Sequence, residues 1–255
     1  MVPLLVLLSL GIHANWKRGR LEVAAKPLLV TLAVAVVLGA AAVFGIYGGR
    51  HALAITGFGI GGWIILSSLV DPVDRLRRHL SVSRAVLGMT LAHIGLAVAV
   101  IALAGVESYT SERDIALGAG ASAEIGGYDF KLVGTQALEG PNYSATRATV
   151  VVSREGRMIT TLYPEVRQFW VQQQTRKVAG IYNLHGTDLF IALGDNLGAG
   201  RWSLRAQIRP LITLLWLGPL FMALGGALAL SDRRYRLARA AAPATLARAA
   251  HGEAH

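Results

Sequence analysis

Residues 85–106 read AVLGMTLAHIGLAVAVIALAGV, twenty-two residues without an Asp, Glu, Lys or Arg. A helix rises about 1.5 Å per residue, so this stretch is long enough to cross the roughly 30 Å hydrocarbon core of a bilayer. The chain as a whole is 53% hydrophobic with a mean hydropathy of +0.48, which is more apolar than an ordinary soluble domain. Three further charge-free stretches have a similar length: residues 27–49, 52–70 and 210–231. The sequence therefore predicts an integral membrane protein.

A fifth apolar stretch, residues 1–16, ends at Lys17 and is short for a crossing. It is interpreted as a short span or as the tail of a longer one. A cleaved signal peptide is not favoured, because no basic residue precedes the stretch and Trp16-Lys17-Arg18 stands where small residues should be. The predicted fold is thus mainly α, with about five transmembrane helices.

The basic residues predict how the chain is oriented. The formal charge is +10, yet residues 107–209 hold eleven Lys/Arg against ten Asp/Glu. The other basic residues gather at the predicted helix ends, and segments rich in Lys and Arg stay on the cytoplasmic side. This pattern predicts an external N-terminus, a cytoplasmic C-terminus and an external domain at residues 107–209, and it gives no reason to expect nucleic acid as a partner. The three basic clusters are Lys17, Arg18, Arg20 and Lys26; Arg75, Arg77, Arg78 and Arg84; and Arg233, Arg234, Arg236, Arg239 and Arg248.

The four parts of the chain follow from these boundaries. Residues 1–106 are predicted to hold helices one to four, residues 107–209 the external domain, residues 210–232 the final helix and residues 233–255 a cytoplasmic tail. The external part is rich in β-branched and aromatic residues in short runs, which is typical of strands. We expect a β-rich sandwich or barrel-like domain, with a hairpin turning at residues 154–157. The predicted strands are residues 128–133, 146–153, 158–163, 188–193 and 202–208.

No cysteine is present, so the chain can form no disulfide and carries no CxxC pair and no CxxCH haem-attachment site. The residue types also show no catalytic triad, no phosphate-binding loop and no paired metal ligands. Ionisable residues inside a span are expensive and are candidates for function. The sequence therefore directs attention to His93, the ninth residue of the 85–106 stretch.

His93 admits two interpretations. Histidine is a common axial ligand of haem iron, and the small residues Gly88, Ala92, Gly95 and Ala99 form one stripe of the helix that would let a macrocycle or another helix approach closely. Alternatively, the imidazole stays neutral and donates a hydrogen bond to a neighbouring backbone group or hydroxyl, such as that of Thr90 one turn away, without any metal.

Other candidates have simpler explanations. We expect His13, His51, His79 and His185 to be solvated without a metal. The arginines of residues 75–78, next to Asp71 and Asp74, could bind anionic membrane lipid, but anchoring of the topology explains them as well. Four aromatic residues of the external domain could line a binding surface or belong to its core: Tyr143, Tyr163, Trp170 and Tyr182.

The run Met89-Thr-Leu-Ala-His93-Ile-Gly-Leu-Ala-Val98 is similar to a segment with a haem-ligating histidine in the CcmF family, the haem lyase subunit of the cytochrome c maturation system. The second match is Pro210, Trp216-Leu-Gly218, Met222-Ala-Leu-Gly-Gly226 and Ser231-Asp-Arg-Arg-Tyr-Arg236, similar to the final span and its exit. Between them, Tyr163-Pro-Glu with Arg167, and Asp188 to Asp195, resemble the external domain. Family members are longer and carry a tryptophan-rich segment, two external histidines and a second transmembrane histidine upstream, so the resemblance covers a C-terminal part only.

The resemblance implies a function in the bacterial inner (cytoplasmic) membrane. The family moves haem from a periplasmic haem chaperone to the CxxCH thiols of apocytochrome c, and a membrane-bound haem b supplies electrons. His93 matches one axial ligand of that haem, and no catalytic residue is carried over. The implied partners are other cytochrome c maturation subunits and the upstream part of the same lyase. Alone, this chain is expected to be inactive as a haem lyase. Two other classes stay open, a transporter component and a non-catalytic membrane scaffold.

Overall fold

The computed structural model describes residues 2–11, 21–46, 48 and 51–232. It divides into two units: Met1–Ala104 with Leu214–His255, which holds the helices, and Gly105–Thr213, which holds the strands. Five helices are described: α1 (Val2–Gly11), α2 (Leu21–Ile46), α3 (Ala52–Arg77), α4 (Arg84–Tyr109) and α5 (Ile212–Leu230).

Four of the helices, α2 to α5, are long and apolar enough to cross a membrane, so the four predicted spans are confirmed and the protein is a multi-pass membrane protein. The fifth predicted span, residues 1–16, is described only in part. Helix α1 has ten residues and is about 15 Å long, which is half of a hydrocarbon core. Residues 12–16 of that stretch lie outside the described part of the chain, so a fifth crossing stays a prediction.

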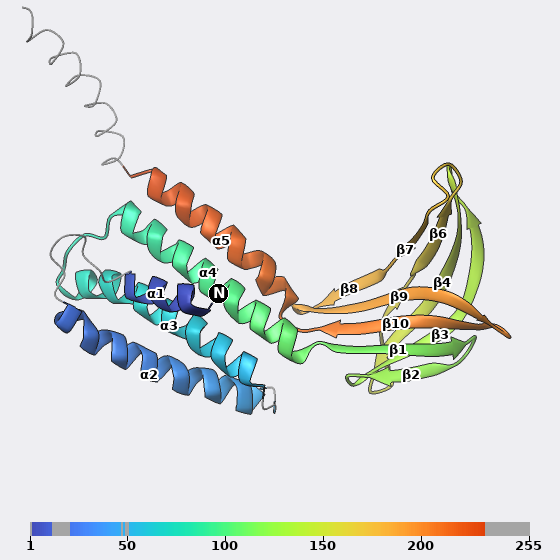
Figure 1. Cartoon of the computed structure of the whole chain (residues 1–255), viewed down its shortest axis with the longest axis horizontal. Helices are drawn as coiled ribbons and strands as arrows, with labels where there is room; N and C mark the ends of the chain where they lie inside the picture. Colours follow the sequence, from blue (N-terminus) through green and yellow to red (C-terminus); the bar gives the residue numbers. More distant parts are fainter. Residues whose placement is uncertain (1, 12–20, 47, 49–50, 233–255) are drawn as a thin grey trace, which may run out of the picture. The chain divides into compact units, whose positions relative to one another are not determined.

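Glycines allow α3 to pack closely between α2 and α4 (Figure 1). A Cβ built on Gly39 of α2 would lie 2.9 Å from the backbone nitrogen of Gly59 in α3, and one built on Gly57 would lie 2.2 Å from Cβ of Ala104 in α4. Between membrane helices, where lipid is as apolar as the side chains, such close backbone approach is a main source of stability. The indole N–H of Trp63 donates to the Leu28 carbonyl oxygen at 3.2 Å and further joins α3 to α2.

The small-residue stripe of α4 is covered by α5. A Cβ on Gly88 would lie 2.5 Å from the carbonyl oxygen of Gly225, and a Cβ on Gly95 would lie 2.6 Å from that of Gly218. Of the two partners predicted for this stripe, a macrocycle or a helix, the helix is therefore the one found. Gly88 and Gly95 are seven residues apart, as are Gly218 and Gly225, so two matched close approaches hold the pair together.

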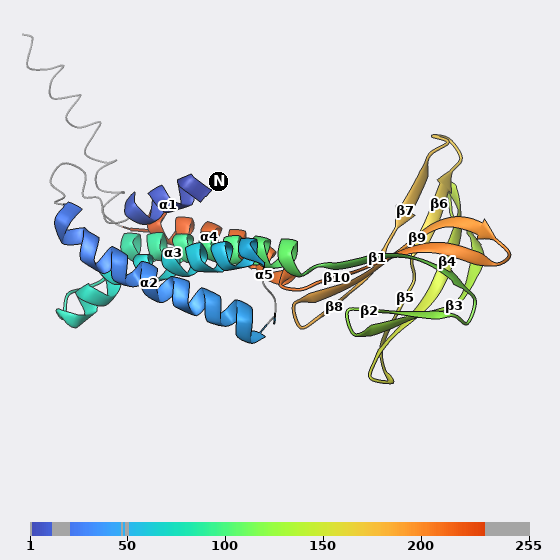
Figure 2. The ribbon, with the colours of Figure 1, turned by 60° about the horizontal axis from the view of Figure 1, so that its bottom comes forward.

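The strand-rich unit is a sandwich of two antiparallel sheets that curl strongly (Figures 1 and 2), which confirms the predicted β-rich class. One sheet has the order β1-β10-β9-β8, and the other has the order β2-β3-β4-β6-β7 with β5 also paired to β4. The strands are β1 (Ser111–Gly118), β2 (Ser122–Ile125), β3 (Tyr128–Glu139), β4 (Tyr143–Arg154), β5 (Arg157–Leu162), β6 (Glu165–Phe169), β7 (Thr175–Val178), β8 (Gly180–Leu184), β9 (Thr187–Gly198) and β10 (Arg201–Arg209).

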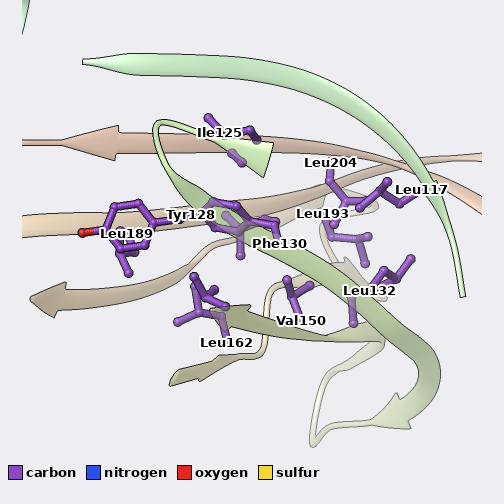
Figure 3. Packing of buried hydrophobic residues seen from close by; sticks show 14 of the residues in the cluster. Leu117, Ile125, Tyr128, Phe130, Leu132, Val150, Leu162, Leu189, Leu193 and Leu204 are labelled. Atoms are coloured by element: carbon purple, nitrogen blue, oxygen red, sulfur yellow. The ribbon is translucent and has the colours of Figure 1, made fainter. Parts of the chain in front are cut away.

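All five predicted strands are present, as β3, β4, β5, β9 and β10, and most extend beyond the predicted bounds. The predicted hairpin joins β4 to β5 through Glu155 and Gly156, whose φ angles are 51° and 75°. Two central residues with positive φ make the type of turn whose twist matches that of the flanking strands. The alternating side chains of both sheets meet in one apolar core (Figure 3), which includes Phe130, Leu132, Val150, Leu189, Ile191, Leu193 and Leu204.

Candidate functional site

His93 lies in α4, about 14 Å along the helix from Arg84. Its side chain is half-buried, and its Nδ1 atom is buried without a hydrogen bond of good geometry to any described residue, although the Met89 carbonyl lies one turn earlier. A buried ring nitrogen without a partner costs free energy, so such an atom in a native protein calls for an explanation.

Of the hydrogen bonds expected for a metal-free His93, the one to the Thr90 hydroxyl is not found, whereas the Met89 backbone, one turn earlier, lies close enough to interact with the imidazole. The hydroxyl of Thr90 is buried and donates instead to the Ser68 carbonyl oxygen of α3, at 3.4 Å. Thr90 therefore joins α4 to α3 and does not form a hydrogen bond with the His93 imidazole.

His93 lines an apolar cavity between α1 and α4. The cavity has a volume of about 620 Å³, which is within the roughly 300–1,000 Å³ of typical cofactor and ligand sites. Because Nδ1 is buried, Nε2 is the ring nitrogen that a molecule in this cavity could reach. The remaining lining is apolar and comes from Leu4, Leu5, Leu7, Leu8 and Gly11 of α1 and Met89 and Leu96 of α4.

This arrangement meets the requirements of a haem ligand. A haem needs one or two axial donors, an apolar surround for the macrocycle and little competing water. The site offers a single imidazole among leucines, and α5 lies along the glycine stripe and not in the cavity. The residues therefore fit a haem, with His93 as the only polar contact among the described lining residues.

The other candidate histidines do not join His93. His51, His79 and His185 are all exposed, and His13 lies outside the described residues. Among the residues that the structure describes, no group of three His, Cys, Asp or Glu side chains could hold a metal ion. No second histidine thus lies at this cavity in the described part of the chain.

The arginines at the end of α3 are partly neutralised along the helix. Arg75 pairs with Asp71 at 2.9 Å, and Arg78 pairs with Asp74 at 3.0 Å. Exposed pairs of this kind add little stability, but they leave Arg77 as the exposed cation of this segment without an ion pair. Binding of anionic lipid here stays a prediction.

Three open, polar hollows lie on the strand-rich unit. The largest, about 780 Å³, lies between β1 and β2 next to Glu112, Arg113 and Glu124. A second, about 520 Å³, lies beside Asp114, Phe190 and Arg205, and a third, about 300 Å³, lies beside Glu107 and Arg209. Arg205 donates two hydrogen bonds to Asp114, at 2.8 and 3.0 Å, and these lower the pKa of that carboxyl.

The aromatic residues singled out in this domain have different environments. Tyr143 packs on Phe169 with ring centroids 5.4 Å apart, and the Arg167 guanidinium lies 4.7 Å from the Tyr143 centroid. Tyr163, Trp170 and Tyr182 are about half exposed, and none of the three is among the core residues of the sandwich. The sequence did not single out Arg147, which the register of β4 and β6 places beside Glu165.

Comparison with known proteins identifies relatives along most of the chain. Residues 108–210 match the family described as CcmF C-terminal beta-sandwich. The chain is 35% identical, over 93% of its length, to the cytochrome c-type biogenesis protein CcmF of Pseudomonas aeruginosa, of which it covers 37%. It is 37% identical, over 99% of its length, to the cytochrome c-type biogenesis protein ccl1 of Rhodobacter capsulatus, of which it covers 39%.

The chain thus spans less than two fifths of the length of these relatives. A solved structure named cytochrome c heme lyase CcmF has the same fold, with a TM-score of 0.72 over 91% of this chain and 38% of that one, at 21% identity. The matches agree in sequence and in fold over both units. The strand-rich unit therefore belongs to the family of the CcmF C-terminal beta-sandwich, and the chain as a whole is similar to the C-terminal part of cytochrome c-type biogenesis proteins CcmF.

Proposed function

We propose that this chain is part of a cytochrome c haem lyase of the inner membrane and that His93 is one axial ligand of a b-type haem. The observation that carries the proposal is the imidazole itself: it lies at the edge of an apolar cavity in a membrane helix, with Nδ1 buried and Nε2 left as the nitrogen that a ligand could reach. Similarity to cytochrome c-type biogenesis proteins supports the same conclusion.

Each lining residue has a role in this proposal. His93 would hold the iron through Nε2, and the leucines of α1 and α4 would cover the macrocycle and exclude water. When bound, the haem would supply one-electron chemistry, with a potential that depends on burial and on the ligands. A second histidine would come from the upstream part of the lyase or from a partner subunit, since no described histidine other than His93 lines the cavity.

The strand-rich unit belongs, in the same proposal, on the periplasmic side. The near balance of charge over residues 107–209 and the basic segments at the opposite helix ends support this orientation, with the N-terminus outside and the C-terminus inside. There the unit works beside a haem chaperone, an apocytochrome c and other maturation subunits. The chain assists haem transfer and does not perform it alone.

The test is the haem content of the membrane complex purified through a tag on this chain. His93→Ala is expected to remove most of the b-type haem absorption, because the iron would lose a ligand and the cavity would lose its polar contact. His79→Ala is the matched control, since His79 is an exposed histidine after α3 and should leave the spectrum unchanged.

Two outcomes would contradict the proposal. An unchanged haem spectrum in His93→Ala, with the complex intact, would show that His93 is a packing residue. A complex that contains no haem with the unaltered chain would favour a non-catalytic scaffold, which has no need for an imidazole inside a span.

A further inference from the structure

A buried carboxylate organises two arginines on the face of β4 and β6 that points away from the apolar core. Glu165 is 4% exposed. Its Oε1 atom accepts from Arg147 at 2.6 Å, and its Oε2 atom accepts from Arg167 at 2.7 Å. Each carboxylate oxygen thus fixes one guanidinium, while the two arginine side chains remain 37% and 30% exposed.

A third arginine stands in register with this pair. Arg176 of β7 lies directly opposite Arg167 of β6 and is exposed. Among the described residues, no ion pair engages Arg176. Like charges opposite each other on neighbouring strands are destabilising. We call this surface the arginine face and define it by Arg147, Arg167 and Arg176. Together with Glu165, its three arginines give a net charge of +2.

The hairpin next to the arginine face exposes two apolar side chains at its tip. After Phe169, Trp170 is 49% exposed and Val171 is 88% exposed. The Trp170 N–H donates to the Asn142 carbonyl oxygen at 3.2 Å, and Gln173 Nε2 donates to the Trp170 carbonyl oxygen at 2.8 Å. Exposed tryptophan beside arginine is typical of protein interfaces, which are enriched in both residues.

We propose that the arginine face binds an acidic segment of a partner polypeptide. Its net positive charge calls for carboxylates, which accept hydrogen bonds from guanidinium groups in a bidentate manner. The three hollows described above are lined by other residues and not by these arginines. The adjoining tryptophan and valine favour a protein over an inorganic ion. The inference does not depend on haem at His93.

The test uses the absence of cysteine from the chain. Gln174→Cys introduces one thiol, two residues from Arg176, at an exposed position that a polarity-sensitive fluorophore can label. The labelled full chain, in nanodiscs of neutral lipid, is titrated with an oligoglutamate peptide. Because the fluorophore reports local binding, peptide bound to the cytoplasmic arginines does not contribute. Saturable binding is expected at low salt, and it should weaken as salt increases.

Matched variants locate the binding. Arg176→Glu, in the labelled background, should weaken peptide binding about fivefold or more, since it reverses one charge of the face. Arg157→Glu makes the same change of charge at an exposed residue of β5 and should leave the affinity unaltered. Arg176→Gln, which only removes the charge, should give an intermediate affinity. Circular dichroism checks that each variant is folded.

Three results would overturn the proposal. The first is equal weakening by Arg176→Glu and Arg157→Glu, which would indicate a response to total charge. The second is an affinity that neither variant changes. The third is a fluorophore that does not respond to the peptide but responds to phosphatidylglycerol vesicles, with a response that depends on Arg176. The arginine face would then bind lipid.

Discussion

At the scale of single residues, Glu165 has the most informative ionisation. Burial by itself raises the pKa of a carboxyl group, but the hydrogen bonds from Arg167 and Arg147 outweigh it and lower the pKa of Glu165. A carboxyl group with a lowered pKa stabilises the folded state above its unfolded pKa of about 4.3. That contribution is lost as the pH falls through the folded value, because the unfolded chain then binds the proton more readily.

Glu165→Gln should therefore change both stability and its pH dependence. At neutral pH we expect a loss of about 2 kcal/mol, less than the ~3–5 kcal/mol of a fully buried pair, because both arginines are about a third exposed. As the pH falls below about 4.3 and through the lower pKa of the folded state, the two proteins should converge. The measurement is thermal unfolding of the chain in detergent, followed by circular dichroism across the acid range. Parallel curves for the two proteins would refute the account of Glu165.

His93 and Glu165 differ in how far the sequence could predict them. His93 was identified because a titratable residue within an apolar stretch is conspicuous by its position alone. The partner Arg147 is eighteen residues from Glu165, and only the register of β4 against β6 brings the two together. No local pattern carries that register, so the arginine face could not be predicted from the sequence.

At the scale of elements, the contact between α4 and α5 depends on the absence of side chains. Gly95→Ala places a Cβ about 2.6 Å from backbone atoms of α5, which cannot move aside as a flexible side chain would. We expect a loss of about 1–3 kcal/mol, typical of overpacking. Gly226→Ala is the control, because no atom lies within 4 Å of a Cβ built there. Thermal unfolding in detergent should separate the two variants, and equal melting temperatures would disprove the close packing.

The start of α4 is capped by a residue from beyond the end of α5. The Ala85 N–H donates to Asp232 Oδ2 at 2.9 Å, and Asp232 is buried. A carboxylate at a helix N-terminus accepts a hydrogen bond from a free backbone N–H and interacts favourably with the helix dipole. Asp232→Ala should cost about 1 kcal/mol, whereas Asp232→Asn retains an acceptor and should cost less. Chemical denaturation of both variants tests this, and an Ala variant as stable as the unaltered chain would exclude a capping role.

The elements themselves were predicted to different extents. The long strands β3, β4, β9 and β10 carry several core residues each, so their apolar runs were visible in the sequence. Strands β2 and β7 have four residues each, and β7 reads TRKV, with three exposed residues. Such short, polar segments become strands only because a neighbouring strand pairs with them, and tertiary pairing leaves no local signal.

At the scale of the whole molecule, the orientation can be tested because the chain lacks cysteine. Gln172→Cys lies in the tip between β6 and β7, and Ser81→Cys lies between α3 and α4; both positions are exposed. In intact spheroplasts, an impermeant maleimide should label the first and not the second. After permeabilisation it should label both. Labelling of Ser81→Cys alone in intact spheroplasts would reverse the proposed topology.

Hydropathy and charge predicted the membrane class, four crossings and the placement of the strand-rich domain in the sequence, because each depends on composition over some twenty residues. Which helices pack together was not predicted. The small stripe of α4 fitted a macrocycle or a helix equally well in sequence, and only the backbone of α5 distinguishes them. The cavity beside His93 depends likewise on α1, whose contacts carry no sequence signal.

The central claim is that His93 binds haem iron. Its most direct test is to remove the His93 side chain and to add free imidazole in its place. His93→Gly in the complete lyase removes the ring and leaves space at the α4 wall of the cavity. If His93 ligates haem iron, the b-type spectrum should be lost in this variant and should return, saturably, when imidazole is added. A b-type spectrum that persists in His93→Gly without imidazole would contradict the claim.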